Sequence, residues 1–144
     1  MICVFFGHHD CPDSIKGRLS EAIRKQIETG STLFFVGTHG SFDSIALSCL
    51  REIKKDCPKI KYAVVLAYLP NDSSPYLPEE TVVPEGIETV PKRFAIDYRN
   101  LWMIDRADTV ISYVTHSSGK AAYYVEKARK KGATIINLIK QNNR

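Results

Sequence analysis

All four histidines of this 144-residue chain follow short apolar runs, in stretches that are also rich in glycine and serine. They are His8, His9, His39 and His116. An imidazole ring can move a proton near neutral pH, hydrogen-bond to a ligand or bind a metal ion. The HxH, HExxH and CxxC spacings of many metal sites are absent, so we predict no bound metal. We interpret the histidines as ligand contacts, although loops also hold polar residues without a binding role.

Two of these stretches open predicted helices in a way that suits phosphate. Glycine lets a ligand approach the backbone closely, and a helix N-terminus offers free N–H groups and a positive dipole end. Neither stretch is a Walker A loop or a GxGxxG fingerprint, and two ordinary helix caps are the plain alternative. The candidate ligand-binding residues from these stretches and from the first turn are Gly7, His8, His9, Gly37, Thr38, Gly40, Ser41, Phe42, Thr115, His116, Ser117, Ser118, Gly119 and Lys120.

Arg99 and Asn100 complete the candidate set, with Arg99 as the side chain that would anchor an anion. A guanidinium is planar and can bind two phosphate oxygens at once. Lys92, Arg99 and Arg106 recur every seven residues, however, so they lie near one face of a predicted helix. A solvated basic stripe, paired weakly with nearby acids, is the alternative interpretation.

The elements that must position these residues alternate along the chain. Apolar runs at 2–6, 32–36, 62–69, 109–114 and 134–139 predict strands, and amphipathic stretches between them predict helices that end near Gly30, Arg106 and Gly132. This alternation predicts an α/β fold: a Rossmann-like, doubly wound parallel sheet of about five strands in the order 3-2-1-4-5, with helices on both faces. Ligands of such sheets bind at the carboxyl ends of the strands, near the point where the strand order reverses.

The whole chain, 1–144, is predicted to form one domain. Segment 70–91 holds five of the seven prolines, and we expect a long loop there that is functional or mobile. Hydrophobic residues make up 44% and charged residues 25%, a balance typical of globular proteins. The net charge of +4 favours anionic ligands but is too small and too dispersed for a nucleic-acid binder. The sequence shows no signal peptide, no membrane span and no cysteine framework, so we expect a reduced, cytoplasmic protein.

The segments FFGHHD, VGTHGSFD, VPEGIETVPKRFAIDYRNLWMI and SYVTHSSGKAAYYVEKARKKGATIINL resemble small bacterial proteins of the SLOG superfamily. That group joins YpsA-like proteins, the DNA-uptake protein SMF and the LOG cytokinin-activating enzymes. The resemblance implies a Rossmann-like domain whose loops bind a nucleotide or a nucleotide-derived molecule, often in sensing. By analogy with related folds it also implies a possible homodimer.

The resemblance to the LOG enzymes is incomplete. Their Arg-Lys-x-x-Met stretch matches segment 99–103, where Arg99 is kept and the lysine is not. Their PGGxGTxxE motif falls on 115–123, with Gly119 retained and Tyr123 in place of the catalytic glutamate. We therefore assign no catalytic residue and no cofactor, and we favour a binding or sensing module. The alternatives are a nucleotide N-glycosidase that uses Asp43 or Glu126, and an interaction domain with a vestigial pocket.

Overall fold

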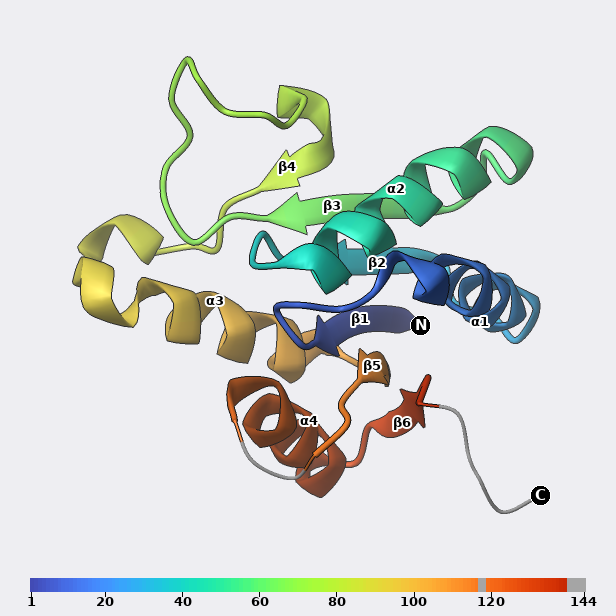
Figure 1. Ribbon diagram of the computed structural model, residues 1–144. Helices are drawn as coiled ribbons and strands as arrows, with labels where there is room; N and C mark the ends of the chain where they lie inside the picture. Colours follow the sequence, from blue (N-terminus) through green and yellow to red (C-terminus); the bar gives the residue numbers. More distant parts are fainter. Residues whose placement is uncertain (117–118, 140–144) are drawn as a thin grey trace.

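Six parallel strands form one central sheet in the computed structural model, which describes residues 1–116 and 119–139 (Figure 1). The spatial order of the strands is β4-β3-β2-β1-β5-β6. Continuous apolar runs form the middle strands because both of their faces are covered. The strands are β1 (Ile2–Gly7), β2 (Leu33–Val36), β3 (Lys61–Val65), β4 (Thr81–Val82), β5 (Thr109–Tyr113) and β6 (Thr134–Asn137).

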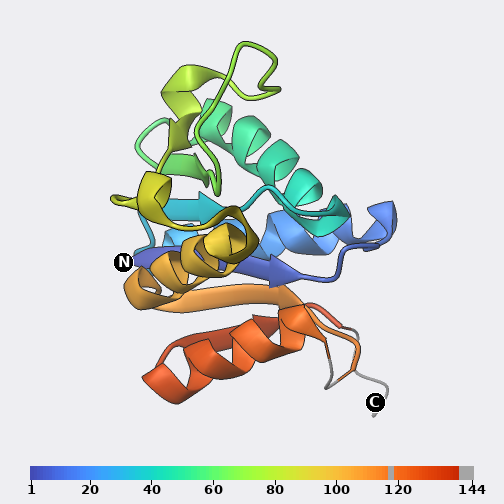
Figure 2. The same cartoon turned by 90° about the vertical axis from the view of Figure 1, so that its left-hand side faces the viewer.

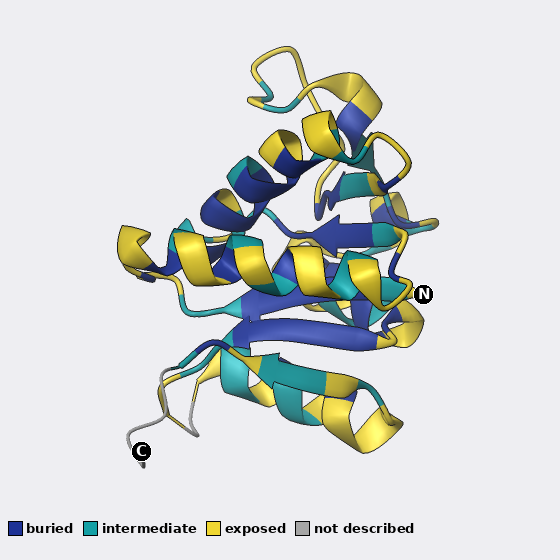
Figure 3. Cartoon of the chain, turned by 90° about the vertical axis from the view of Figure 1, so that its right-hand side faces the viewer, coloured by how far each residue is buried: buried dark blue, intermediate teal, exposed yellow. Residues whose placement is uncertain are grey.

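Two pairs of helices cover the two faces of the sheet. Helices α1 (Lys16–Glu28) and α2 (Ser41–Asp56) pack on one face, and α3 (Lys92–Arg106) and α4 (Lys120–Lys131) pack on the other. Figure 3 shows the central strands buried between helices whose outer surfaces are exposed. Short 3-10 helices occupy Asp13–Ile15 (η1), Pro78–Glu80 (η2) and Ile87–Thr89 (η3). None of the helices in the described part of the chain combines the length and apolar character that a membrane crossing needs.

The predicted α/β architecture is confirmed, and one strand is added to it. The five predicted strands correspond to β1, β2, β3, β5 and β6, and their order is the predicted 3-2-1-4-5. Glycines end α1 and α4 as expected, since Gly30 and Gly132 have φ values of +113° and +111°, which side chains with a Cβ rarely adopt.

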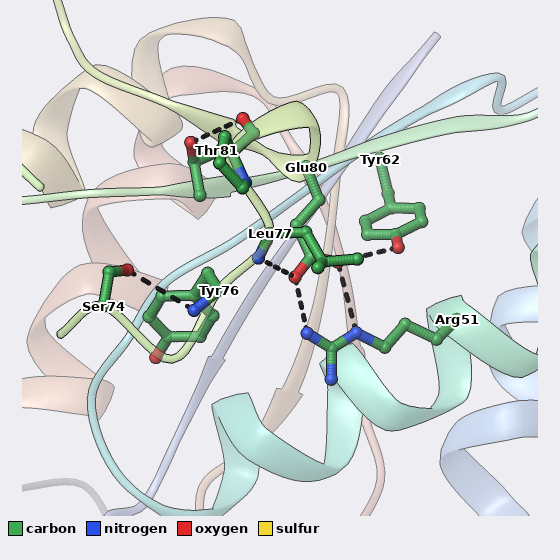
Figure 4. A network of polar contacts seen from close by, with 8 residues as sticks. Arg51, Tyr62, Ser74, Tyr76, Leu77, Glu80 and Thr81 are labelled. Atoms are coloured by element: carbon green, nitrogen blue, oxygen red, sulfur yellow. Dashed lines mark hydrogen bonds and ion pairs between the residues drawn. The ribbon is translucent and has the colours of Figure 1, made fainter. Parts of the chain in front are cut away.

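The sixth strand, β4, lies inside segment 70–91, where the sequence predicts only a loop. Its two residues pair with Val64 and Val65 of β3, so the segment adds an edge to the sheet. Glu80, just before β4, is buried and accepts hydrogen bonds from Arg51 Nε (3.1 Å), Tyr62 Oη (2.9 Å) and the Leu77 backbone N–H (3.0 Å) (Figure 4). Nη2 of Arg51 donates as well, so a buried carboxylate with four donor groups from three residues fixes the proline-rich segment to α2 and β3.

The sheet brings the ends of β1, β2 and β5 together, because the chain crosses on one face from β1 to β2 and on the other face into β5. Backbone N–H groups make three of the hydrogen bonds that join the segments around these strand ends. The Ser41 N–H donates to the His9 carbonyl (2.8 Å), the His8 N–H to the Tyr113 carbonyl (3.1 Å), and the Thr115 N–H to Nε2 of His8 (2.7 Å). In Figure 2, β1 ends on the side of the molecule where α2 begins.

Candidate functional site

A cleft of about 700 Å³ lies at the carboxyl ends of β1, β2 and β5, at the predicted edge of the sheet. Its polar lining comes mainly from the turns after these strands and from the middle of α3. The sequence-predicted residues that the structure brings together in this lining are Gly7, His8, His9, Gly37, Arg99, Asn100, Thr115, His116 and Lys120. Ser117 and Ser118 were also predicted, and they lie outside the described residues.

Five predicted residues do not line this cleft: Thr38, Gly40, Ser41, Phe42 and Gly119. Phe42 is fully buried in the core, and a Cβ on Gly7 would stand 2.3 Å from its ring. Ser41 donates from both its N–H and its hydroxyl to the His9 carbonyl, at 2.8 Å each. The first N–H of α2 is therefore used within the protein.

Gly40 is expected to be essential for this junction between β1 and α2. Its φ of +94° is in a region that L side chains rarely adopt, and a Cβ would stand 2.7 Å from the His9 Cα. We predict that Gly40→Ala lowers the free energy of unfolding by about 2–4 kcal/mol, from backbone strain and overpacking together. Chemical denaturation measures the change. Gly17→Ala is the control, because Gly17 is exposed in α1 with open space around it and should not be destabilised. Equal stability of the two variants would contradict the prediction.

The four histidines form two pairs in the cleft. The His8 and His116 rings stack with centroids 4.4 Å apart, and the His9 and His39 rings meet edge to face at 5.2 Å. Nε2 of His8 accepts the Thr115 N–H, which keeps that nitrogen unprotonated, and burial together with His116 lowers the His8 pKa. Burial and then the Arg99 charge lower the pKa of His39.

Across residues 1–116 and 119–139, no three histidine, cysteine or acidic side chains gather as a metal site would need.

Arg99 belongs to the core and not to a solvated stripe. Its side chain is only 1% exposed, whereas Lys92 and Arg106 are exposed and Arg106 lies over the Trp102 ring. Nη1 donates to the Val65 carbonyl (2.9 Å) and to Thr38 Oγ1 (3.2 Å), and Nε donates to Asn100 Oδ1 (2.7 Å). These bonds use all the hydrogens of Nη1 and Nε, so Nη2 is the nitrogen left for a ligand.

Asp43 lines the same cleft, although the sequence raises it only as a possible hydrolytic carboxylate. It stands in the first turn of α2, half-buried, and Oδ2 accepts the His39 N–H at 3.0 Å. Burial raises the pKa of Asp43 to about 6, against the opposing effects of the His39 N–H and the Arg99 and His9 charges. The signal in the sequence was an acid three residues after Gly40, which is also an ordinary feature of a helix start.

The other carboxylate considered, Glu126, lies away from the cleft lining and pairs with Arg129 one turn along α4. Tyr123, at the position of the LOG glutamate, is 53% exposed. The apolar wall of the cleft was not anticipated, because its members have the spacing of ordinary core residues. These are Phe5, Phe6, Ile96, Met103, Ala121 and Tyr124.

No family model matches this chain, and no curated protein is similar to it. Fold and cleft together define the class: a Rossmann-like α/β protein with a mixed polar and apolar cleft where the strand order reverses.

Proposed function

We propose that the cleft binds a nucleotide or a nucleotide-derived molecule, and that the protein is a binding or sensing module of the SLOG type. The observation that carries this proposal is the buried Arg99, whose Nη2 has no hydrogen bond to any described residue and whose side chain lines the cleft. Nη2 is not among the buried polar atoms without a partner in the described part of the chain, so it is open to the cleft, where a ligand oxygen can accept its hydrogens in place of solvent.

The polar and apolar residues of the cleft lining suit the two parts of a nucleotide. His39, Asp43, Arg99 and Lys120 provide charge and hydrogen bonds for a sugar phosphate. The apolar part of the lining includes Phe6 and Tyr124, whose rings stack on each other 5.6 Å apart and leave a small apolar edge that a base could contact. Each of the four segments that resemble the SLOG superfamily contributes residues to the lining of this cleft, which supports the assignment. A homodimer and a cytoplasmic location are proposed from the resemblance and from composition.

A thermal-shift screen with AMP, NAD and ADP-ribose tests the binding proposal. A ligand at ~100 times its dissociation constant adds about 2.7 kcal/mol of stability, which corresponds to roughly 5–10 °C for a chain of this size. Binding should be weaker in Arg99→Ala and unchanged in Arg106→Ala, which removes an exposed arginine from the same helix. The absence of a shift with every compound would favour an interaction domain with a vestigial pocket.

The position of Asp43 favours a second candidate function, hydrolysis of an N-glycosidic bond. A carboxylate in a cleft with a pKa of about 6 can take a proton from water and return it to a leaving base. Water would add to C1′ of the ribose while the bond from C1′ to the base nitrogen breaks. Incubation with AMP, NAD or ADP-ribose followed by chromatography tests this reaction. Release of free base by the wild type, and not by Asp43→Asn, would make the protein an enzyme.

A further inference from the structure

Asp43 and Arg99 both lie close to the bare backbone of Gly37 in the lining of the cleft. The place where a Gly37 Cβ would stand is 2.9 Å from Oδ2 of Asp43 and 3.3 Å from Nη1 of Arg99. These distances limit the separation of Oδ2 from Nη1 to about 6 Å. The ion pairs found in the described part of the chain, all with N–O distances within 4.0 Å, do not include these two residues. The opposite charges are therefore close but not in contact.

Both groups keep unused hydrogen-bonding capacity. Nη2 of Arg99 and Oδ1 of Asp43 have no hydrogen bond to any residue that the structure describes. A ligand oxygen that accepts a hydrogen bond from Nη2 and donates one to the Asp43 carboxylate, each of about 2.8 Å, would connect the two groups. That oxygen must accept from the guanidinium and donate to the carboxylate. A hydroxyl group does both, whereas an ionised phosphate oxygen has no hydrogen to donate and would be repelled by Asp43.

We propose that a sugar hydroxyl of the ligand binds between Asp43 and Arg99, which makes these two residues the determinants of specificity for a ribosyl group. This inference rests on the proposed binding function and assigns the sugar part of the ligand to a defined place. The phosphate then lies elsewhere in the cleft, where Lys120 is the other cationic side chain of the lining. A Cβ at Gly37 would stand 2.9 Å from Oδ2, so any side chain there would displace the Asp43 carboxylate.

Calorimetric binding of AMP and of 2′,3′-dideoxy-AMP tests the proposal, since the two probes differ only in the ribose hydroxyls. At about pH 7.5 the wild type should bind AMP about 10- to 100-fold more tightly, the range expected for a hydrogen bond to a charged group. Asp43→Asn should reduce this ratio to a few-fold, and Asp105→Asn, an exposed control on α3, should leave it unchanged. Equal binding of both probes by the wild type, or an undiminished ratio in Asp43→Asn, would overturn the proposal.

A pH series on the wild type gives a second readout that does not depend on the variant folding. The phosphate of the two probes titrates alike, so its effect cancels in the ratio of their affinities. The charged or titratable groups around Asp43 are Arg99, His9, His39 and Tyr76. The ratio should fall between about pH 7.5 and about pH 5, because a protonated Asp43 is a poorer acceptor. A phosphate in this position would instead tighten both probes at low pH with no change in the ratio. If neither probe binds at any pH, and NAD and ADP-ribose give no thermal shift either, the proposed function itself is wrong, and this inference fails with it.

Discussion

Arg99→Ala is expected to weaken the binding of AMP by about 10- to 100-fold, which corresponds to about 1.5–3 kcal/mol. The loss arises because Nη2 is the donor that Arg99 leaves for a ligand. The guanidinium cannot form a bidentate pair with a phosphate through Nη1 and Nη2, because Nη1 already donates to the Val65 carbonyl and to Thr38. Isothermal calorimetry on folded protein measures the change, with Arg106→Ala as the matched surface control.

Adenosine, measured beside AMP, shows which part of the ligand Arg99 contacts. The sequence predicts a phosphate anchor, in which case the variant would lose affinity for AMP and keep its affinity for adenosine. The arrangement of Asp43 and Gly37 predicts instead that both compounds lose affinity to a similar extent, because both carry the ribose hydroxyls. An Arg99→Ala variant that binds AMP as well as the wild type would contradict both interpretations.

The same substitution should also lower stability by about 2–4 kcal/mol, because it leaves a cavity and removes the donor to the Val65 carbonyl. Arg99→Lys is the informative companion. Its ammonium can still reach one of these acceptors, but it lacks the geometry of the guanidinium. Far-UV circular dichroism and urea denaturation then separate lost affinity from lost structure.

Glu80→Ala is expected to lower the free energy of unfolding by about 2–4 kcal/mol. Glu80 is 4% exposed, and its carboxylate accepts hydrogen bonds from Arg51, Tyr62 and the Leu77 backbone (Figure 4). Without it, the Tyr62 hydroxyl and the Leu77 N–H lose their acceptor. Arg51 is 43% exposed and can return to water, so the loss is smaller than for a fully buried ion pair. Urea denaturation measures the change, and Glu79→Ala, at an exposed neighbour, is the control.

The pH dependence of Glu80→Gln gives an independent test of the same network. Burial alone would raise the Glu80 pKa, but the hydrogen bonds from Arg51, Leu77 and Tyr62 outweigh it, so the pKa is lowered. A carboxylate with a lowered pKa in the folded state stabilises the protein above its unfolded pKa of about 4.3, and this contribution is lost as the pH falls. The difference in stability between wild type and Glu80→Gln should therefore be largest near neutral pH and shrink below about pH 4. A difference that stays constant between neutral and acidic pH would show that the ionised carboxylate does not stabilise this segment.

The sequence by itself determined the order of the main strands and the edge of the sheet where polar groups gather. Both features follow from local signals, namely the spacing of the apolar residues and the positions of the glycines. The continuous run 62–69 is typical of a strand covered on both faces, and Gly30 and Gly132 end helices because they alone tolerate a positive φ there. Parallel strands place all of their carboxyl ends at one edge, so His8, His39 and His116 had to lie near one another.

Tertiary structure decided what the individual residues of the cleft can do. Lys92, Arg99 and Arg106 have the same periodicity, but only Arg99 meets the end of β3, where the Val65 carbonyl holds it in the core. Strand β4 is too short to leave a pattern of its own and forms because β3 offers it an edge. The opposed pair of Asp43 and Arg99 joins residues 56 positions apart in the chain. No local sequence pattern predicts that these two side chains come close. Their separation depends on how α2 and α3 pack against opposite faces of the sheet.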